Sequence, residues 1–116
     1  MLDRTMNGRM SLTIVNEETQ DVVRSLHHKY KGETKQQSQA INEKLADALS
    51  QVCKSTMFGD EFNDGADKGE GTAEIHYTWR AFYEDGEPAA EAQIIWYDCD
   101  SVEVAAAIGL FESLKT

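Results

Sequence analysis

The chain has 116 residues, of which 41% are hydrophobic and 28% are charged, and its formal net charge at pH 7 is −10. This length is typical of one domain, and the apolar runs are too short for a membrane-spanning helix. The two cysteines do not form a disulfide framework, and no secretory signal is visible, so we expect a cytoplasmic protein with reduced thiols and no membrane partner.

The charge is divided unequally along the chain. Residues 1–56 carry eight Lys or Arg and seven Asp or Glu, whereas residues 57–116 carry three basic and fourteen acidic residues. An acidic half repels phosphate backbones, so direct nucleic-acid binding is not expected. The same charge suits a basic protein surface, although it also serves solubility alone.

Residues 1–10 show no hydrophobic period and are expected to form a flexible N-terminal arm. Residues 11–15 read as a short strand, with Leu12 and Ile14 on one face. Asn16 then has the features of a helix N-cap, and Gly32 those of a C-cap. The sequence between them predicts a helix, with an apolar stripe made of Val22, Val23, Leu26 and Tyr30.

A second helix is predicted from Thr34, because Gln37 lies three residues later, as a capping box requires. Its apolar residues fall on one helical face. They are Ile41, Leu45, Ala48, Leu49 and Val52.

Residues 58–71 are rich in glycine and acids and predict a mobile loop. Its acidic residues are Asp60, Glu61, Asp64, Asp67 and Glu70. The order of Asp60, Asp64 and Gly65 partly matches a calcium-binding loop. However, Phe62 and Gly71 occupy positions where that loop needs oxygen ligands, so we expect no metal.

Residues 73–98 predict a β-hairpin that turns at Asp85-Gly86. Hydrophobic residues alternate with polar ones, and Asp-Gly is typical of a two-residue type I′ turn. The turn fixes a register in which large and small apolar residues face each other. The expected pairs are Ile75 with Trp96, Tyr77 with Ile94, Trp79 with Ala92, Ala81 with Ala90, His76 with Ile95, Thr78 with Gln93, Arg80 with Glu91, and Glu84 with Glu87.

The last segment, residues 102–115, predicts a helix that Asp100 and Glu103 cap reciprocally. The element order is then β-α-α-β-β-α. This order predicts one α+β domain over residues 11–116, with a three-stranded antiparallel sheet and helices packed on one face.

The hairpin leaves a second face, made of His76, Thr78, Arg80, Phe82, Glu91, Gln93, Ile95 and Tyr97. Three of these residues, Phe82, Ile95 and Tyr97, are too apolar for plain contact with water. Large apolar residues inside a polar frame are typical of an interface. We therefore expect a small non-enzymatic interaction protein that binds itself, as a homodimer, or another protein. Accessory, inhibitor and immunity proteins, including phage-encoded ones, share this size and charge.

Two alternatives remain open. The first is a small enzyme or ligand-binding domain with a pocket between sheet and helices, near His76, Tyr77, Asp98 and Asp100. No nucleophile and base are recognisable in the sequence, so no catalytic residue and no cofactor are predicted. The second is an inhibitor that imitates nucleic acid through its acidic residues.

Overall fold

The computed structural model describes residues 4–53 and 73–115. Over these residues the elements follow the order β-β-α-β-β-α and are followed by one turn of 3-10 helix. The elements are β1 (Thr5–Asn16), β2 (Val22–Thr34), α1 (Lys35–Val52), β3 (Ala73–Tyr83), β4 (Pro88–Cys99), α3 (Ser101–Glu112) and η1 (Ser113–Lys115).

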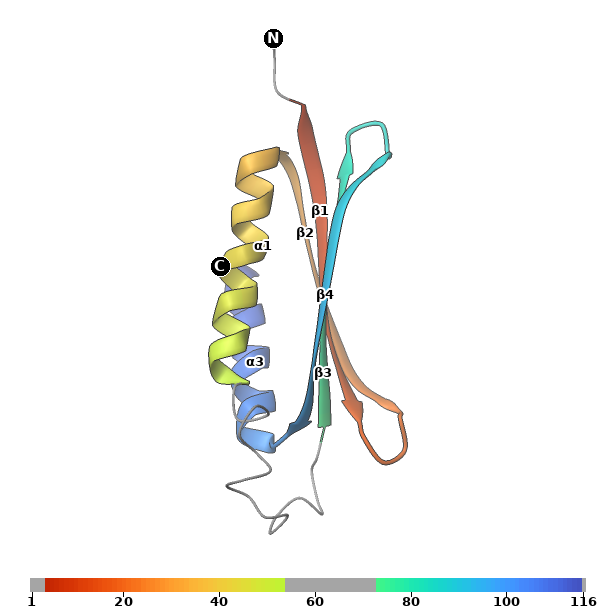
Figure 1. Ribbon diagram of the computed structural model, residues 1–116, viewed down its shortest axis with the longest axis vertical. Coiled ribbons are helices and arrows are strands. Elements are labelled where there is room, and N and C mark those ends of the chain that lie inside the picture. The colour runs from red at the N-terminus through yellow and green to blue at the C-terminus, as the bar shows by residue number, and fades with distance from the viewer. Residues whose placement is uncertain (1–3, 54–72, 116) are drawn as a thin grey trace.

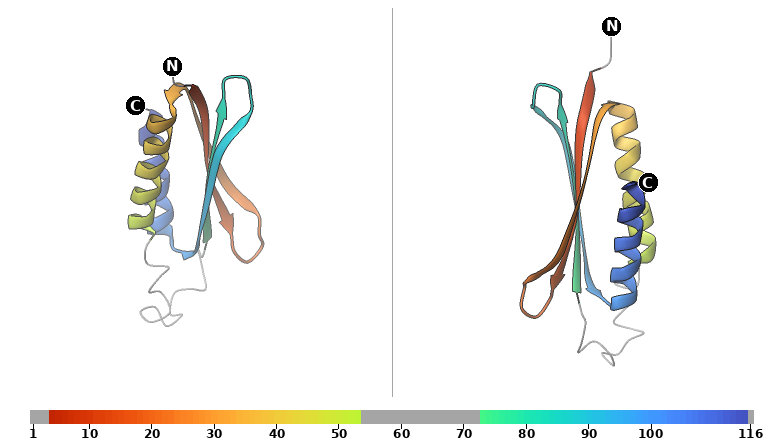
Figure 2. Two further views of the ribbon diagram at one scale, coloured as in Figure 1. Left: turned by 45° about the horizontal axis from the view of Figure 1, so that its top comes forward. Right: turned by 180° about the vertical axis from the view of Figure 1, so that it is seen from behind.

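The strands form one antiparallel sheet in the order β2-β1-β3-β4. Both helices cover the same face of this sheet, and the two hairpin turns project to the other side, at opposite ends (Figures 1 and 2). The predicted α+β class, antiparallel sheet and one-sided helices are thus confirmed. The predicted three strands and the order β-α-α-β-β-α are wrong, since the described part has four strands and two α-helices.

The strand that the sequence did not predict is β2. A helix was predicted in its place, after Asn16. The Asn16 Oδ1 atom accepts hydrogen bonds from the backbone N–H groups of Glu18 (2.9 Å) and Thr19 (3.0 Å), as it would in a helix N-cap. Gln20 then adopts φ 64°, and its N–H donates to the Asn16 carbonyl over 2.7 Å. Asparagine side chains initiate both helices and turns through this bond. Here the turn forms, and the chain returns along β1.

Residues 5–10, expected to be part of a flexible arm, are instead the first half of β1. Even-numbered positions in β1 are buried against the helices: Met6, Gly8, Met10, Leu12 and Ile14. This is a strict period of two, but glycine and methionine are weak strand formers, which concealed it. β1 is a central strand that pairs with both β2 and β3.

The predicted register of the β3–β4 hairpin is confirmed over its seven pairs from Ile75–Trp96 to Ala81–Ala90. The predicted two-residue turn at Asp85-Gly86 is wrong, since Phe82 pairs with Pro88 and the Tyr83 N–H donates to the Glu87 carbonyl over 2.8 Å. Gly86 has φ 93°, while Asp85 keeps a negative φ. The loop is therefore a three-residue turn with glycine in the left-handed position, and Glu84 does not face Glu87.

The predicted helix caps are confirmed at Thr34 and Asp100, and each forms a full capping box, with Gln37 and Glu103 respectively. The helices bury Leu45, Leu49 and Phe111 against the inner face of the sheet. None of the helices in the described part of the chain is long and apolar enough to cross a membrane.

Candidate functional site

The outer side of the sheet faces away from both helices, and we call it the open face (Figure 1). β1 and β2 contribute Asn7, Arg9, Ser11, Thr13, Ser25, His27 and Lys29. Those in β1 alternate with buried residues, and those in β2 lie opposite Thr13, Ser11 and Arg9 in the β1–β2 register. β3 and β4 contribute the eight residues predicted as an interface: His76, Thr78, Arg80, Phe82, Glu91, Gln93, Ile95 and Tyr97. The structure thus gathers these eight on one surface and doubles its width.

The most unusual feature of the open face is a row of three cations across adjacent strands, which we call the cation row. Arg9 of β1 lies directly opposite Lys29 of β2 on one side and Arg80 of β3 on the other. Opposed residues in antiparallel strands lie about 5 Å apart at their Cα atoms. Like charges at this spacing repel, so the row lowers stability unless an anion neutralises it.

The cation row contrasts with the charge of the whole chain. Residues 73–114 contain nine acids and one Lys or Arg, and that residue is Arg80. Glu91 neutralises the charge of Arg80 only weakly, because the Arg80 Nε atom is 3.9 Å from the Glu91 carboxylate and both side chains are more than half exposed. A screened pair of this kind contributes little. The positive charge therefore remains available to a ligand.

A hollow of about 670 Å³ lies over the cation row. It is lined by Arg9, Ser11, His27, Lys29, Thr78 and Arg80. A second hollow of about 230 Å³ shares Thr78 and Arg80 with it and adds Glu91, Ala92 and Gln93. The first lining carries hydrogen-bond donors and no carboxylate, whereas the second has the Glu91 carboxylate as an acceptor.

Acidic turns flank the open face at both ends. The β1–β2 turn carries the exposed residues Glu18 and Asp21, and the β3–β4 turn carries Glu84, Asp85 and Glu87. Both turns project toward the open side of the sheet (Figure 2). At about 3.3 Å per residue, Glu84 lies roughly 13 Å along the strand from Arg80, beyond the screening length at physiological salt. The turns therefore leave the positive charge at the centre intact.

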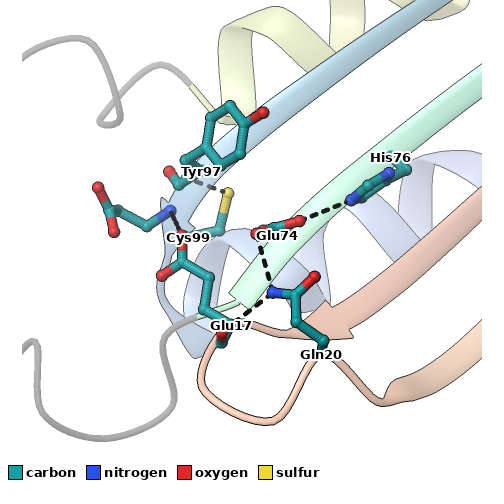
Figure 3. A network of polar contacts seen from close by, with 7 residues as sticks. Glu17, Gln20, Glu74, His76, Tyr97 and Cys99 are labelled. Atoms are coloured by element: carbon teal, nitrogen blue, oxygen red, sulfur yellow. Dashed lines mark hydrogen bonds and ion pairs between the residues drawn. The ribbon is translucent and has the colours of Figure 1, made fainter.

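A polar network occupies the end of the sheet near the β1–β2 turn (Figure 3). The His76 Nε2 atom is 2.8 Å from Glu74, and the Gln20 side-chain amide donates to the same carboxylate over 3.3 Å. The hydrogen bond from His76 holds the pKa of Glu74 below its usual value. The Glu17 carboxylate accepts a bond from the Asp98 N–H over 3.1 Å, but burial and the nearby acids raise its pKa.

Within the described residues, His76 and Tyr77, which were predicted to line one pocket with Asp98 and Asp100, lie on opposite faces of the sheet. His76 lies on the open face, whereas Tyr77 is fully buried on the helix side, where its hydroxyl donates to the Asn42 Oδ1 atom over 2.6 Å. Asp100 is engaged as the N-cap of α3. The sheet therefore separates these side chains.

The cysteines are poor nucleophiles. Cys53 and Cys99 are both fully buried. A hydrogen bond between the Cys99 thiol and Cys53, together with burial, raises the pKa of the Cys99 thiol far above its ordinary value. Reactive cysteines instead have lowered pKa values and some exposure.

The candidate metal ligands also fail to gather within the described residues, where no group of three or more His, Cys, Asp or Glu could hold an ion. The acidic segment 58–71, with Asp60, Glu61, Asp64, Asp67 and Glu70, lies outside the described residues. The sequence expectations for that segment therefore stay predictions.

The cation row was missed from the sequence because Arg9 and Lys29 were assigned to an arm and a helix. The signal that locates Arg9 is the period of two in β1, since odd positions must then face outward. Lys29 follows from the same rule, because Leu26 and Tyr30 lie on the inner side of β2.

Comparisons with family models, with curated proteins and with solved structures give no match to this chain.

Proposed function

We propose that this protein is a non-enzymatic binding protein that recognises an anionic partner through the open face of its sheet. The observation that carries the proposal is the cation row of Lys29, Arg9 and Arg80. Aligned like charges lower the stability of the free protein and become favourable when an anion neutralises them. Binding of an anion would then offset the repulsion between the three cations in the folded protein.

Backbone amide shifts in NMR spectra test this function directly. Tripolyphosphate and a pentaglutamate peptide serve as two unrelated anionic probes. At least one should shift the amides of the strands around Arg9, Lys29 and Arg80, and leave α1 unchanged. Uniform small shifts over the whole chain, or none with either probe, would refute an anion-binding face.

A second candidate is self-association through the same face. Tyr97 is 52% exposed, and Phe82 and Ile95 are half-buried, which supports an interface with an apolar centre. This candidate predicts a homodimer in solution, in which a second copy of the chain covers the open face.

Light scattering separates the two candidates. The double variant Phe82→Asp/Ile95→Asp should turn a dimer into a folded monomer, because buried charges at an interface are costly. Val102→Asp is the control, since Val102 is 73% exposed at the start of α3, far from the open face. A wild-type monomer at high concentration would exclude self-association and leave the face to an anionic partner.

A further inference from the structure

We infer that the ligand of the cation row is a small organic polyphosphate whose head group carries hydroxyl or amino groups, as in nucleoside di- and triphosphates. The inference rests on the proposed function and specifies the ligand of that site. It is argued from the charge, the size and the lining of the two hollows.

Charge density favours phosphate over carboxylate. Arg9, Lys29 and Arg80 place three positive charges around one hollow, and Thr78 adds a neutral hydroxyl donor, whereas the Ser11 hydroxyl is hydrogen-bonded to His27 over 3.1 Å. A phosphate group carries up to about two negative charges and three strong acceptor oxygens near pH 7. A carboxylate carries one charge and two oxygens, so a peptide would need several acidic side chains on one spot. Two linked phosphates supply the same charge compactly.

The size of the site and the charge around it favour a small ligand over a polymer. A hollow of about 670 Å³ lies within the ordinary range for small-molecule sites. A nucleic-acid strand or a long acidic peptide following the strands would pass the acidic turns at one or both ends, and would be repelled there. A compact anion at the centre avoids both turns.

The adjoining hollow accounts for the head group. It continues from Thr78 and Arg80 to Glu91 and Gln93. The Glu91 carboxylate would repel phosphate but accepts hydrogen bonds from hydroxyl or amino groups, and the Gln93 amide both donates and accepts. The two hollows thus present a donor-lined part for phosphates beside an acceptor-bearing part for the head group.

Titration calorimetry with ATP and with tripolyphosphate tests this assignment. Arg9→Gln and Arg80→Gln should each weaken ATP binding about tenfold or more, as the loss of a charge-assisted hydrogen bond predicts. Lys44→Gln is the matched control, because Lys44 is an exposed cation on α1. Its affinity for ATP should stay within about twofold of wild type. An equal loss in all three variants would show a diffuse charge effect and overturn the site.

Glu91→Gln tests the head-group part separately. Wild type should bind ATP more tightly than tripolyphosphate, and the substitution should reduce this ratio, because it removes the acceptor charge while relieving repulsion of phosphate. An unchanged ratio would overturn the role of the second hollow. Thermal melting of each variant confirms that it is folded.

The outcomes distinguish this inference from the function on which it rests. If pentaglutamate binds at the cation row and neither phosphate compound does, the polyphosphate assignment fails and the anion-binding function stands. If a thymidine oligonucleotide binds more tightly than ATP, the ligand is a nucleic-acid strand and the inference is again wrong. If none of these probes binds wild type, both fail.

Discussion

At the scale of single residues, the ring of Tyr30 limits which residue fits at the paired position on β1. Gly8 pairs with Tyr30, and a Cβ atom added at Gly8 would lie 1.9 Å from the Tyr30 Cζ atom. The Tyr30 hydroxyl also accepts a hydrogen bond from the Trp79 Nε1 atom over 2.8 Å and bonds to the buried Ser38 hydroxyl. The ring is therefore held from the helix and the sheet, and cannot yield easily.

We expect Gly8→Ala to lower the free energy of unfolding by about 1–3 kcal/mol, the usual cost of forcing extra atoms into a packed site. Gly109→Ala is the control, since nothing lies within 4 Å of its added Cβ atom. In α3 that change should raise stability by about 0.5–1 kcal/mol. Urea unfolding measures both, and a Gly8→Ala variant as stable as wild type would show that the ring moves freely.

Tyr77 gives a prediction on alkaline pH. Burial raises the pKa of its hydroxyl above the ordinary value of about 10. The unfolded chain therefore ionises first, so the stability that Tyr77 provides is complete below pH 10 and declines as the pH rises further. Tyr77→Phe should cost about 1 kcal/mol at pH 7, through the lost bond to Asn42, and should flatten this decline.

Urea unfolding of wild type and Tyr77→Phe at pH 7, 9 and 10.5 gives the slope of the free energy of unfolding against pH for each protein. Tyr97→Phe is the control, because it removes the hydroxyl of a tyrosine that is 52% exposed, and it should cost much less stability at pH 7 than Tyr77→Phe. Equal slopes in wild type and Tyr77→Phe would contradict the assigned cause.

At the scale of elements, α3 depends on its cap. Asp98, near the end of β4, adopts φ 57°, and Asp100 then accepts a bond from the Glu103 N–H over 2.8 Å. The Glu103 carboxylate in turn accepts a bond from the Asp100 N–H over 3.0 Å. Asp100→Ala should cost about 0.5–2 kcal/mol in unfolding experiments, whereas Asp100→Asn, which keeps the acceptor oxygen, should cost much less. Equal losses in both variants would locate the effect in charge instead of capping.

The elements also show how far the sequence determines the fold. The β3–β4 pairing and both caps could be predicted because each depends on residues close in sequence. β2 could not, because Asn16 supports either a helix or a turn, and Val22, Val23, Leu26 and Tyr30 fit a helical stripe. The choice comes from pairing with β1, whose own pattern was obscured by Gly8, and that glycine is explained by Tyr30 across the strand pair. Contacts between strands decided what local preference left open.

At the scale of the whole molecule, the same dependence on tertiary contacts applies to the candidate site. The eight residues of β3 and β4 could be assigned to one face from their alternation. The cation row could not, since it joins three strands, two of which were not recognised in the sequence at those positions. A net charge of −10 conceals it further, because an acidic average describes no single surface.

The net charge of the whole molecule and the repulsion within the cation row predict opposite changes in stability for Arg9→Gln. Removing a positive charge from a molecule of net charge −10 should lower stability if the overall field dominates. Removing it from between Lys29 and Arg80 should raise stability if the nearest charges dominate. The neighbours are about 5 Å away at their Cα atoms, within the screening length of about 10 Å at 0.1 M salt, whereas Glu84 in the β3–β4 turn lies roughly 13 Å along the strand from Arg80.

We therefore expect Arg9→Gln to raise the free energy of unfolding at 0.1 M NaCl by about 0.2–1 kcal/mol, as relief of opposed like charges does. The gain should shrink at 0.5 M NaCl, where screening weakens the repulsion. Arg24→Gln should have the opposite sign, because the Arg24 side chain is 3.2 Å from Glu112. Destabilisation by both variants would mean that the overall field governs the row, and would remove the energetic reason for an anion to bind there.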